Sequence, residues 1–88
     1  MSSPVIIGQR IKSLREELGL SREQFSNEVG ITLSAVSMYE NGQRIPRDEI
    51  KVKIARVLKT SIEALFLPSR FTNRESVTQA NTNIMRRR

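Results

Sequence analysis

One stretch of the sequence, residues 32–41, combines side chains that can meet a ligand with side chains that can be buried. If this stretch forms a helix, with about 100° of rotation per residue, five of its side chains lie on one face: Leu33, Ser34, Ser37, Met38 and Asn41. The opposite face carries Ala35, Val36 and Tyr39. The first face has no acidic residue, which would repel phosphate groups, and it has no large aromatic residue. The pattern therefore suits a helix that enters the major groove of DNA, although a solvated surface helix taken by itself has the same pattern.

The side chains that most often carry out catalysis or bind metals are missing. The chain of 88 residues contains no histidine and no cysteine, which removes the commonest general base, disulfides and thiolate ligands. The carboxylates give no sign of pairing in a cleft, and the sequence has no glycine-rich phosphate-binding loop. We therefore expect neither an enzyme nor a cofactor or metal site.

Length and charge indicate one small domain with a polyanionic partner. The chain is long enough for one modest core. Its 15 Lys and Arg residues against 9 Asp and Glu residues give a net charge of +6, and such an excess favours nucleic acid as a partner. Residues 70–88 account for +4 of this charge and the preceding residues for +2. No apolar run approaches the roughly 20 residues needed to cross a bilayer, and no signal segment is recognisable, so we expect a cytoplasmic protein that binds no membrane.

Capping residues and glycines divide the first three-quarters of the sequence into five short helices. Ser and Thr residues stand where helix N-caps are expected, and Ser21 with Gln24 forms a capping box. Gly19 and Gly30 supply left-handed ends for the first two helices. The predicted helices span about residues 4–18, 22–29, 33–41, 48–58 and 62–66. No alternation with a period of two occurs, so the fold class is all-α, with a helix-turn-helix over residues 21–41.

The end of the sequence differs in composition from the rest. We expect a helix-turn-helix domain over residues 4–67, followed by a basic tail over residues 68–88 that is rich in Thr, Asn, Ser and Arg. The tail is either flexible or ordered by a partner, because Val77, Ala80 and Ile84 share helical spacing. Four apolar residues are the best candidates for a dimer surface: Leu65, Phe66, Leu67 and Phe71. For the first two, a place in the core is the alternative.

An ordered series of short motifs runs through the sequence from the first predicted helix to the last. It comprises Leu18-Gly19-Leu20-Ser21, Phe25, Val29-Gly30-Ile31-Thr32, the run from Val36 to Gly42, Arg44-Ile45-Pro46, the run from Ile54 to Leu58, and the run from Ser61 to Phe66. This series resembles the Cro and lambda-repressor-like family of helix-turn-helix proteins, also called the Xre family, over about residues 6–67.

The resemblance implies a five-helix DNA-binding domain, without a cofactor, whose third helix contacts base edges. It implies a sequence-specific regulator of transcription that binds double-stranded DNA. Such a protein is expected to act as a repressor homodimer on a pseudo-palindromic operator, in the cytoplasm of a bacterial or mobile-element host cell. The alternative is an antitoxin or adaptor that uses the same fold and holds a protein partner through the tail.

The resemblance also assigns roles to individual residues. Positions that contact base edges in the family correspond to Thr32, Leu33, Ser34, Ser37 and Met38. Positions that contact phosphates correspond to Arg22, Asn41, Gln43, Arg44 and Arg47. A pair between Arg15 and Glu40 is expected to be structural, joining the first helix to the third.

Two departures from the family pattern bear on specificity. Arg22 stands where the family usually has Gln, and Leu33 and Met38 stand where many relatives have Gln or Arg. Leu33 and Met38 cannot make bidentate hydrogen bonds to bases, but they can pack on thymine methyl groups. Alternatively, Leu33 packs at the start of its helix and Met38 fills a gap in the core. Other cations of the folded part are interpreted as solvated charges: Lys12, Lys51, Lys53, Arg56 and Lys59.

Overall fold

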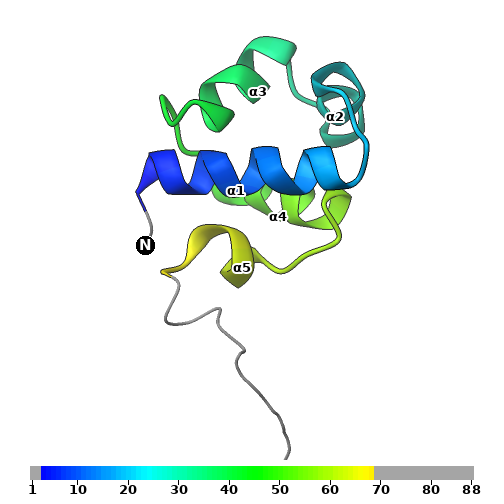
Figure 1. Cartoon of the computed structure of the whole chain (residues 1–88). Coiled ribbons are helices and arrows are strands. Elements are labelled where there is room, and N and C mark those ends of the chain that lie inside the picture. Colours follow the sequence, from blue (N-terminus) through cyan, green and yellow to red (C-terminus); the bar gives the residue numbers. More distant parts are fainter. Residues whose placement is uncertain (1–2, 69–88) are drawn as a thin grey trace, which may run out of the picture.

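Five α-helices form the part of the chain that the computed structural model describes, residues 3–68. They are α1 (Pro4–Glu17), α2 (Arg22–Val29), α3 (Leu33–Glu40), α4 (Asp48–Val57) and α5 (Ile62–Phe66). No strand occurs among these residues, so the all-α prediction is confirmed. In Figure 1, α1 crosses the molecule with α2 and α3 on one side of it and α5 on the other. The predictions for the tail lie outside the described residues, including those for Phe71, Val77, Ala80 and Ile84.

Most helices begin where a hydroxyl side chain can cap them. Four N-cap side chains accept a hydrogen bond from a backbone N–H in the first turn, those of Ser3, Ser21, Thr32 and Ser61. The predicted capping box is complete, since the Gln24 N–H donates to Ser21 Oγ at 3.0 Å and the Ser21 N–H donates to Gln24 Oε1 at 2.8 Å. α4 has no side-chain cap, but two acidic residues in its first turn favour the positive end of its helix dipole.

The turn between α2 and α3 depends on Gly30. Its backbone adopts a left-handed conformation with φ of +84°, which L-residues with a side chain rarely adopt. The chain thereby leaves α2 and enters α3 within three residues, because Thr32 already acts as the next N-cap. This tight connection holds α2 and α3 against each other as the predicted helix-turn-helix.

All five helices contribute to one core. Its fully buried members include Phe25 of α2, Val36 of α3 and Ile54 of α4. Leu65 and Phe66 of α5 also belong to it, with 0% and 1% of their surface exposed. The interpretation of these two residues as a dimer surface is therefore wrong. Both side chains are buried in the core, where α5 packs against α1 and α4.

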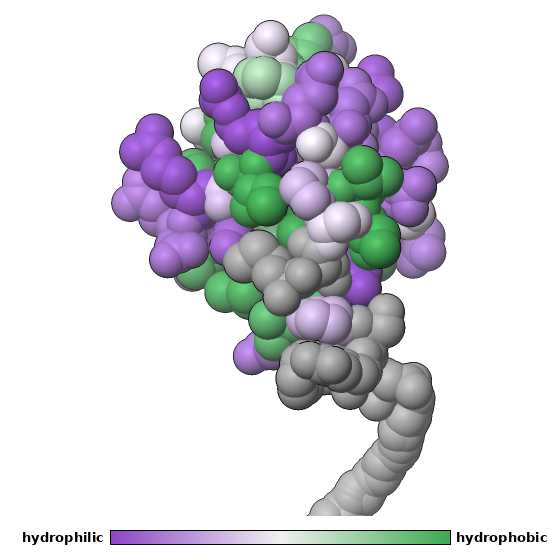
Figure 2. Space-filling model, turned by 90° about the vertical axis from the view of Figure 1, so that its left-hand side faces the viewer, coloured by the Kyte–Doolittle hydropathy of each residue, from purple (hydrophilic) through white to green (hydrophobic). Residues whose placement is uncertain are grey.

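Large apolar side chains that remain exposed are spread over the described residues rather than gathered in one element. They are Val5, Ile6, Leu18, Leu33, Ile45, Val52 and Ile62. Figure 2 shows one face of the molecule, on which separate hydrophobic patches lie among hydrophilic residues. Scattered exposure of this kind is normal for a small domain, so a functional face must be identified from charge and geometry. None of the described helices is both long enough and apolar enough to span a bilayer.

Candidate nucleic-acid interface

α3 has a buried face and an outward face, as the sequence predicts. Val36 and Tyr39 point into the core, with 0% and 7% of their surface exposed. On the other face, Leu33 is 44% exposed and Ser34 is exposed, while Ser37 and Met38 are half-buried. Leu33 is thus not buried at the start of its helix. The face contains no acidic side chain, because Glu40 turns inward.

Thr32, the first residue assigned to base contacts, is the N-cap of α3. Its Oγ1 accepts a hydrogen bond from the Ala35 N–H at 3.0 Å. One lone pair of the hydroxyl is therefore committed to the helix, whereas its O–H can still donate to a ligand. The cap also fixes where α3 begins, and so where Leu33 is presented.

The predicted pair of Arg15 and Glu40 is present and buried. Arg15 Nε donates to Glu40 Oε2 at 2.7 Å and Arg15 Nη2 donates to Glu40 Oε1 at 3.2 Å. Arg15 Nη1 also donates to the Leu20 carbonyl at 2.8 Å. The bidentate geometry fixes both side chains, and only 1% of the Glu40 side chain is exposed. The pair ties α1 to the end of α3 and to the loop before α2.

Arg22, assigned to a phosphate by the resemblance, makes a contact that the sequence did not indicate. Its Nε donates to Glu40 Oε1 at 3.3 Å, so one buried carboxylate has two arginine partners. The Arg22 side chain is still 47% exposed, which leaves part of it accessible to a ligand. The start of α2, the end of α3 and the last turn of α1 therefore meet at Glu40.

Gly8 positions α3 and was missed by the sequence analysis. A Cβ atom at this residue would lie 2.5 Å from the carbonyl oxygens of both Tyr39 and Glu40, so α1 packs directly on the backbone of the last turn of α3. The available signal was a glycine inside a predicted helix, where it costs about 1 kcal/mol relative to alanine. Such a glycine usually has a packing reason.

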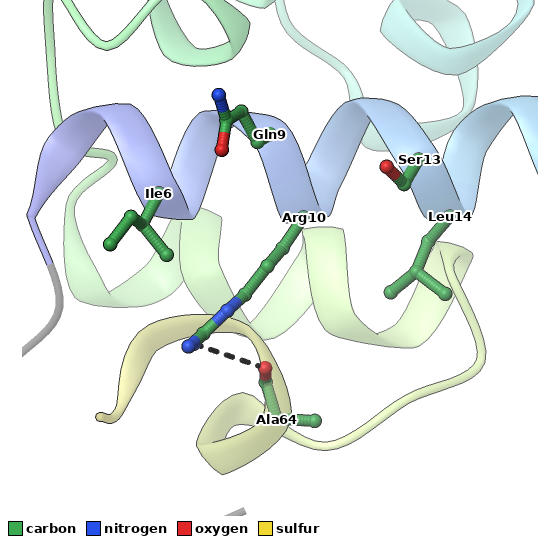
Figure 3. Close-up of a pocket in the computed structure, with 6 residues that line it drawn as sticks. All are labelled: Ile6, Gln9, Arg10, Ser13, Leu14 and Ala64. Atoms are coloured by element: carbon green, nitrogen blue, oxygen red, sulfur yellow. Dashed lines mark hydrogen bonds between the residues drawn. The ribbon is translucent and has the colours of Figure 1, made fainter. Parts of the chain in front are cut away.

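Arg10, also missed, holds α5 in place. Its Nη1 donates to the carbonyl oxygens of Ala64, Leu65 and Leu67 at 3.3, 3.2 and 2.7 Å. Figure 3 shows Arg10 reaching from α1 to α5 between Ile6 and Leu14. This contact lies on the side of α1 away from α3 (Figure 1) and helps to close the core rather than form the outward face.

Two grooves flank α3. The first, called here the α1–α3 groove, contains Leu33 and Ser37, and its charged lining consists of Lys12, Arg15, Glu16, Arg22 and Glu23. The second, called here the loop groove, runs between α3 and the loop that leads to α4. Arg44 and Arg47 line the loop groove together with Thr32, and no carboxylate of residues 3–68 lines it.

The remaining residues assigned to phosphates lie at the end of α3. Asn41 is its C-cap and is exposed, and Gln43 is exposed in the loop that follows. The structure therefore brings the residues assigned to bases onto the outward face of α3. It places those assigned to phosphates around that face, in the loop and at the start of α2.

Comparison with known proteins decides the family. A family model described as helix-turn-helix matches residues 11–65. The chain belongs to the helix-turn-helix family. Its members of the Cro/C1 type are DNA-binding regulators of transcription, not enzymes.

Curated relatives carry the names of regulators. The chain is 36% identical over 59 residues to the cryptic phage CTXphi transcriptional repressor RstR of Vibrio cholerae, a match that covers 67% of this chain and 53% of that protein. It is 34% identical over 65 residues to the uncharacterized HTH-type transcriptional regulator YazB of Bacillus subtilis, covering 74% of this chain and 94% of YazB. The chain thus spans about half the length of the Vibrio repressor but nearly all of YazB.

Two solved structures share the architecture. The restriction-modification controller protein C.AhdI of Aeromonas hydrophila superposes with a TM-score of 0.68 at 35% identity, covering 72% of this chain and 96% of that one. The P22 c2 repressor, crystallised with a synthetic operator, gives a TM-score of 0.69 at 24% identity over 70% of this chain and 94% of that one, a likeness of fold alone. The lambda-repressor-like fold is therefore confirmed.

Proposed function

We propose that this chain binds double-stranded DNA in a sequence-specific manner and regulates transcription, acting as a repressor. The single observation that carries the proposal is the outward face of α3, which projects small polar and apolar side chains and no acid. The regulators and repressors named among its relatives support it.

Base contacts are proposed for the outward face and its cap: Thr32, Leu33, Ser34, Ser37 and Met38. The hydroxyl groups among them can each donate or accept a hydrogen bond at a base edge. None of these side chains can make a bidentate contact. Specificity therefore rests on several weak contacts together with the shape of the DNA.

Phosphate contacts are proposed for the residues that surround this face: Arg22, Asn41, Gln43, Arg44 and Arg47. Their function is to fix the register of α3 in the major groove. Arg44 and Arg47 carry the most weight, because none of the described residues that line the loop groove with them is a carboxylate. Arg22 carries less, because its Nε already donates to Glu40.

A homodimer is proposed because α3 is short. Eight residues of helix offer few base contacts, and two copies would place two such helices in successive major grooves, about 34–36 Å apart, on a pseudo-palindromic operator. We place this activity in the cytoplasm of a bacterial or mobile-element host cell, in keeping with the phage and bacterial regulators to which the chain is similar.

A binding selection from random DNA duplexes, carried out with the full chain, tests the proposal. We expect enrichment of a motif with two-fold symmetry, and its loss or alteration with Ser37→Ala. The matched control is Ser13→Ala, which should leave the motif unchanged, since Ser13 lies on α1 (Figure 3) and lines a pocket with Ala64 of α5 rather than belonging to α3. Binding without any enriched motif would contradict sequence-specific recognition.

A further inference from the structure

The loop groove combines an apolar lining with two arginines. Five of its lining residues are apolar or aromatic: Ile31, Ala35, Tyr39, Ile45 and Ile50. Its volume is about 490 Å³, which lies in the range of roughly 300–1,000 Å³ in which proteins bind small organic molecules. The proposed phosphate contacts use Arg44 and Arg47 but leave the apolar part of the groove without a partner.

The two arginines are available to a ligand. Within residues 3–68, the side chains of Arg44 and Arg47 form no ion pair and no hydrogen bond. Asp48 and Glu49 follow Arg47 in the chain, but neither lines the groove, and Asp48 Oδ1 lies 3.6 Å from Lys51 Nζ. Two guanidinium groups that face one groove without a carboxylate in its described lining favour an anionic ligand.

Tyr39 brings a buried hydroxyl group to the same groove. It is 7% exposed, it lines the groove, and its side chain takes part in no hydrogen bond with the other described residues. A buried tyrosine usually has a hydrogen-bond partner for its hydroxyl, because the group loses water on burial. A ligand oxygen in the groove would accept from this hydroxyl. Thr32 Oγ1 accepts from the Ala35 N–H, so its own O–H is a second donor for the ligand.

A carboxylate attached to an apolar body uses all of these groups. Its two oxygens accept hydrogen bonds from guanidinium and hydroxyl donors, and a charged acceptor strengthens each bond. Its apolar body removes the isoleucine side chains of the groove from water. A DNA phosphate or an inorganic anion would contact the arginines but would leave these apolar side chains uncovered.

We propose that the loop groove binds a small amphipathic carboxylate, which Arg44, Arg47 and Tyr39 hold at its charged end. This ligand site goes beyond the proposed function and does not depend on it. Its consequence rests on the proposed function: because Arg44 and Arg47 are also the proposed phosphate contacts, ligand and DNA compete for the same guanidinium groups. The ligand is then an effector that releases the protein from its operator.

Titration of the full chain with octanoate, followed in amide NMR spectra, tests the site. Acetate and octanamide are the matched compounds, since the first lacks the apolar chain and the second lacks the charge. Octanoate should shift the signals of residues 31–35 and 44–50 and should bind at least about tenfold more tightly than acetate, the factor expected from burying two methylene groups. Equal affinity for acetate or for octanamide would overturn the proposal.

Two variants test the assignment of the charged end. Tyr39→Phe removes only the hydroxyl group, so it should lower octanoate affinity about tenfold while thermal unfolding without ligand stays unchanged. Arg47→Gln should lower the affinity by a similar factor. The matched control is Arg56→Gln, which removes an exposed positive charge of α4 outside the groove and should keep the parent affinity. Parent affinity in Tyr39→Phe or Arg47→Gln would contradict the assigned site.

A second titration separates the ligand site from the proposed function. Octanoate at ten times its dissociation constant should weaken operator binding about elevenfold if the two ligands exclude each other, whereas acetate at the same concentration controls for salt. Octanoate binding in the groove without loss of operator affinity would overturn the competition. If octanoate binds but no operator can be selected, the proposed function fails and the ligand site stands.

Discussion

The two grooves beside α3 differ in charge although they flank the same eight-residue helix. In the α1–α3 groove, cations and carboxylates line the surface together with Leu33, and two of the cations, Arg15 and Arg22, donate hydrogen bonds to Glu40. In the loop groove, the part of the chain that the structure describes contributes Arg44 and Arg47 but no carboxylate. Among the described residues, the cations of the loop groove are therefore less neutralised by nearby carboxylates than those of the α1–α3 groove.

Under the proposed function, the phosphate contacts and the base contacts contribute differently to affinity and specificity. Ionic contacts to phosphates supply binding that depends on salt and hardly on sequence. Contacts to base edges supply discrimination with little dependence on salt. Variants in the two grooves should therefore change different observables.

The largest effect is expected from Glu40→Ala, which removes the carboxylate that neutralises the α1–α3 groove. Arg15 would remain buried without its charged partner, and breaking a buried pair in this way typically costs about 3–5 kcal/mol. Urea unfolding of the full chain measures the change. Glu28→Ala, at an exposed site on α2, is the control and should change stability by less than about 0.5 kcal/mol. A loss below about 1 kcal/mol for Glu40→Ala would contradict the importance of the pair.

Gly8→Ala should have the next largest effect, because it displaces α3 relative to both grooves. The added Cβ would lie 2.5 Å from two backbone oxygens that cannot rotate away. Overpacking of this kind typically costs about 1–3 kcal/mol, and we expect weaker DNA binding even where the variant is fully folded. Circular dichroism and DNA titration at low temperature separate the two losses. Unchanged stability and affinity would mean that α1 does not set the position of α3.

Arg44→Gln and Arg47→Gln should weaken DNA binding by similar factors on all sequences. For each variant, the slope of log affinity against log salt concentration should become shallower by about one unit, as expected for one lost phosphate contact. Leu33→Ala should leave that slope unchanged. Lys53→Gln is the control, because Lys53 is exposed on α4 and lines neither groove. A change in preferred sequence with Arg44→Gln, at a constant slope, would reverse the assignment of the loop groove.

The smallest effect is expected from Lys59→Gly, away from both grooves. Lys59 follows α4 with φ of +58°, the left-handed conformation that costs a residue with a side chain roughly 1–2 kcal/mol. Part of this gain is offset by the greater backbone entropy of glycine in the unfolded chain, so thermal unfolding should show a stabilisation of less than about 1 kcal/mol. DNA affinity should not change. A destabilised variant would show that the lysine side chain makes a compensating contact.

Local features of the fold could be predicted from the sequence. The capping box at Ser21, the left-handed Gly30 and the two faces of α3 depend on residues within one or two turns, which is the range that capping rules and helical periodicity cover. The contact between Arg15 and Glu40 joins residues far apart in the chain, and it was expected only through the family resemblance.

Features that depend on how helices meet in space were missed or wrong. The close approach of Gly8 to Tyr39 and the contact of Arg10 with the end of α5 leave no local pattern. Leu65 and Phe66 were candidates for a dimer surface because a count of apolar residues does not say how many a core of this shape needs. The lining of cations and carboxylates around Leu33 likewise requires α1, α2 and α3 to be placed together.

Recognition of the base sequence by α3 is tested with two duplexes of equal composition, the selected operator and a scrambled version of it. Fluorescence anisotropy with the full chain gives both affinities, for the parent protein and for Met38→Ala. If α3 recognises the base sequence, the parent protein should prefer the operator by about 10³-fold or more at physiological salt. Met38→Ala should lower this ratio while leaving the affinity for the scrambled duplex unchanged. Equal affinity of the parent protein for both duplexes would contradict recognition of the base sequence by α3.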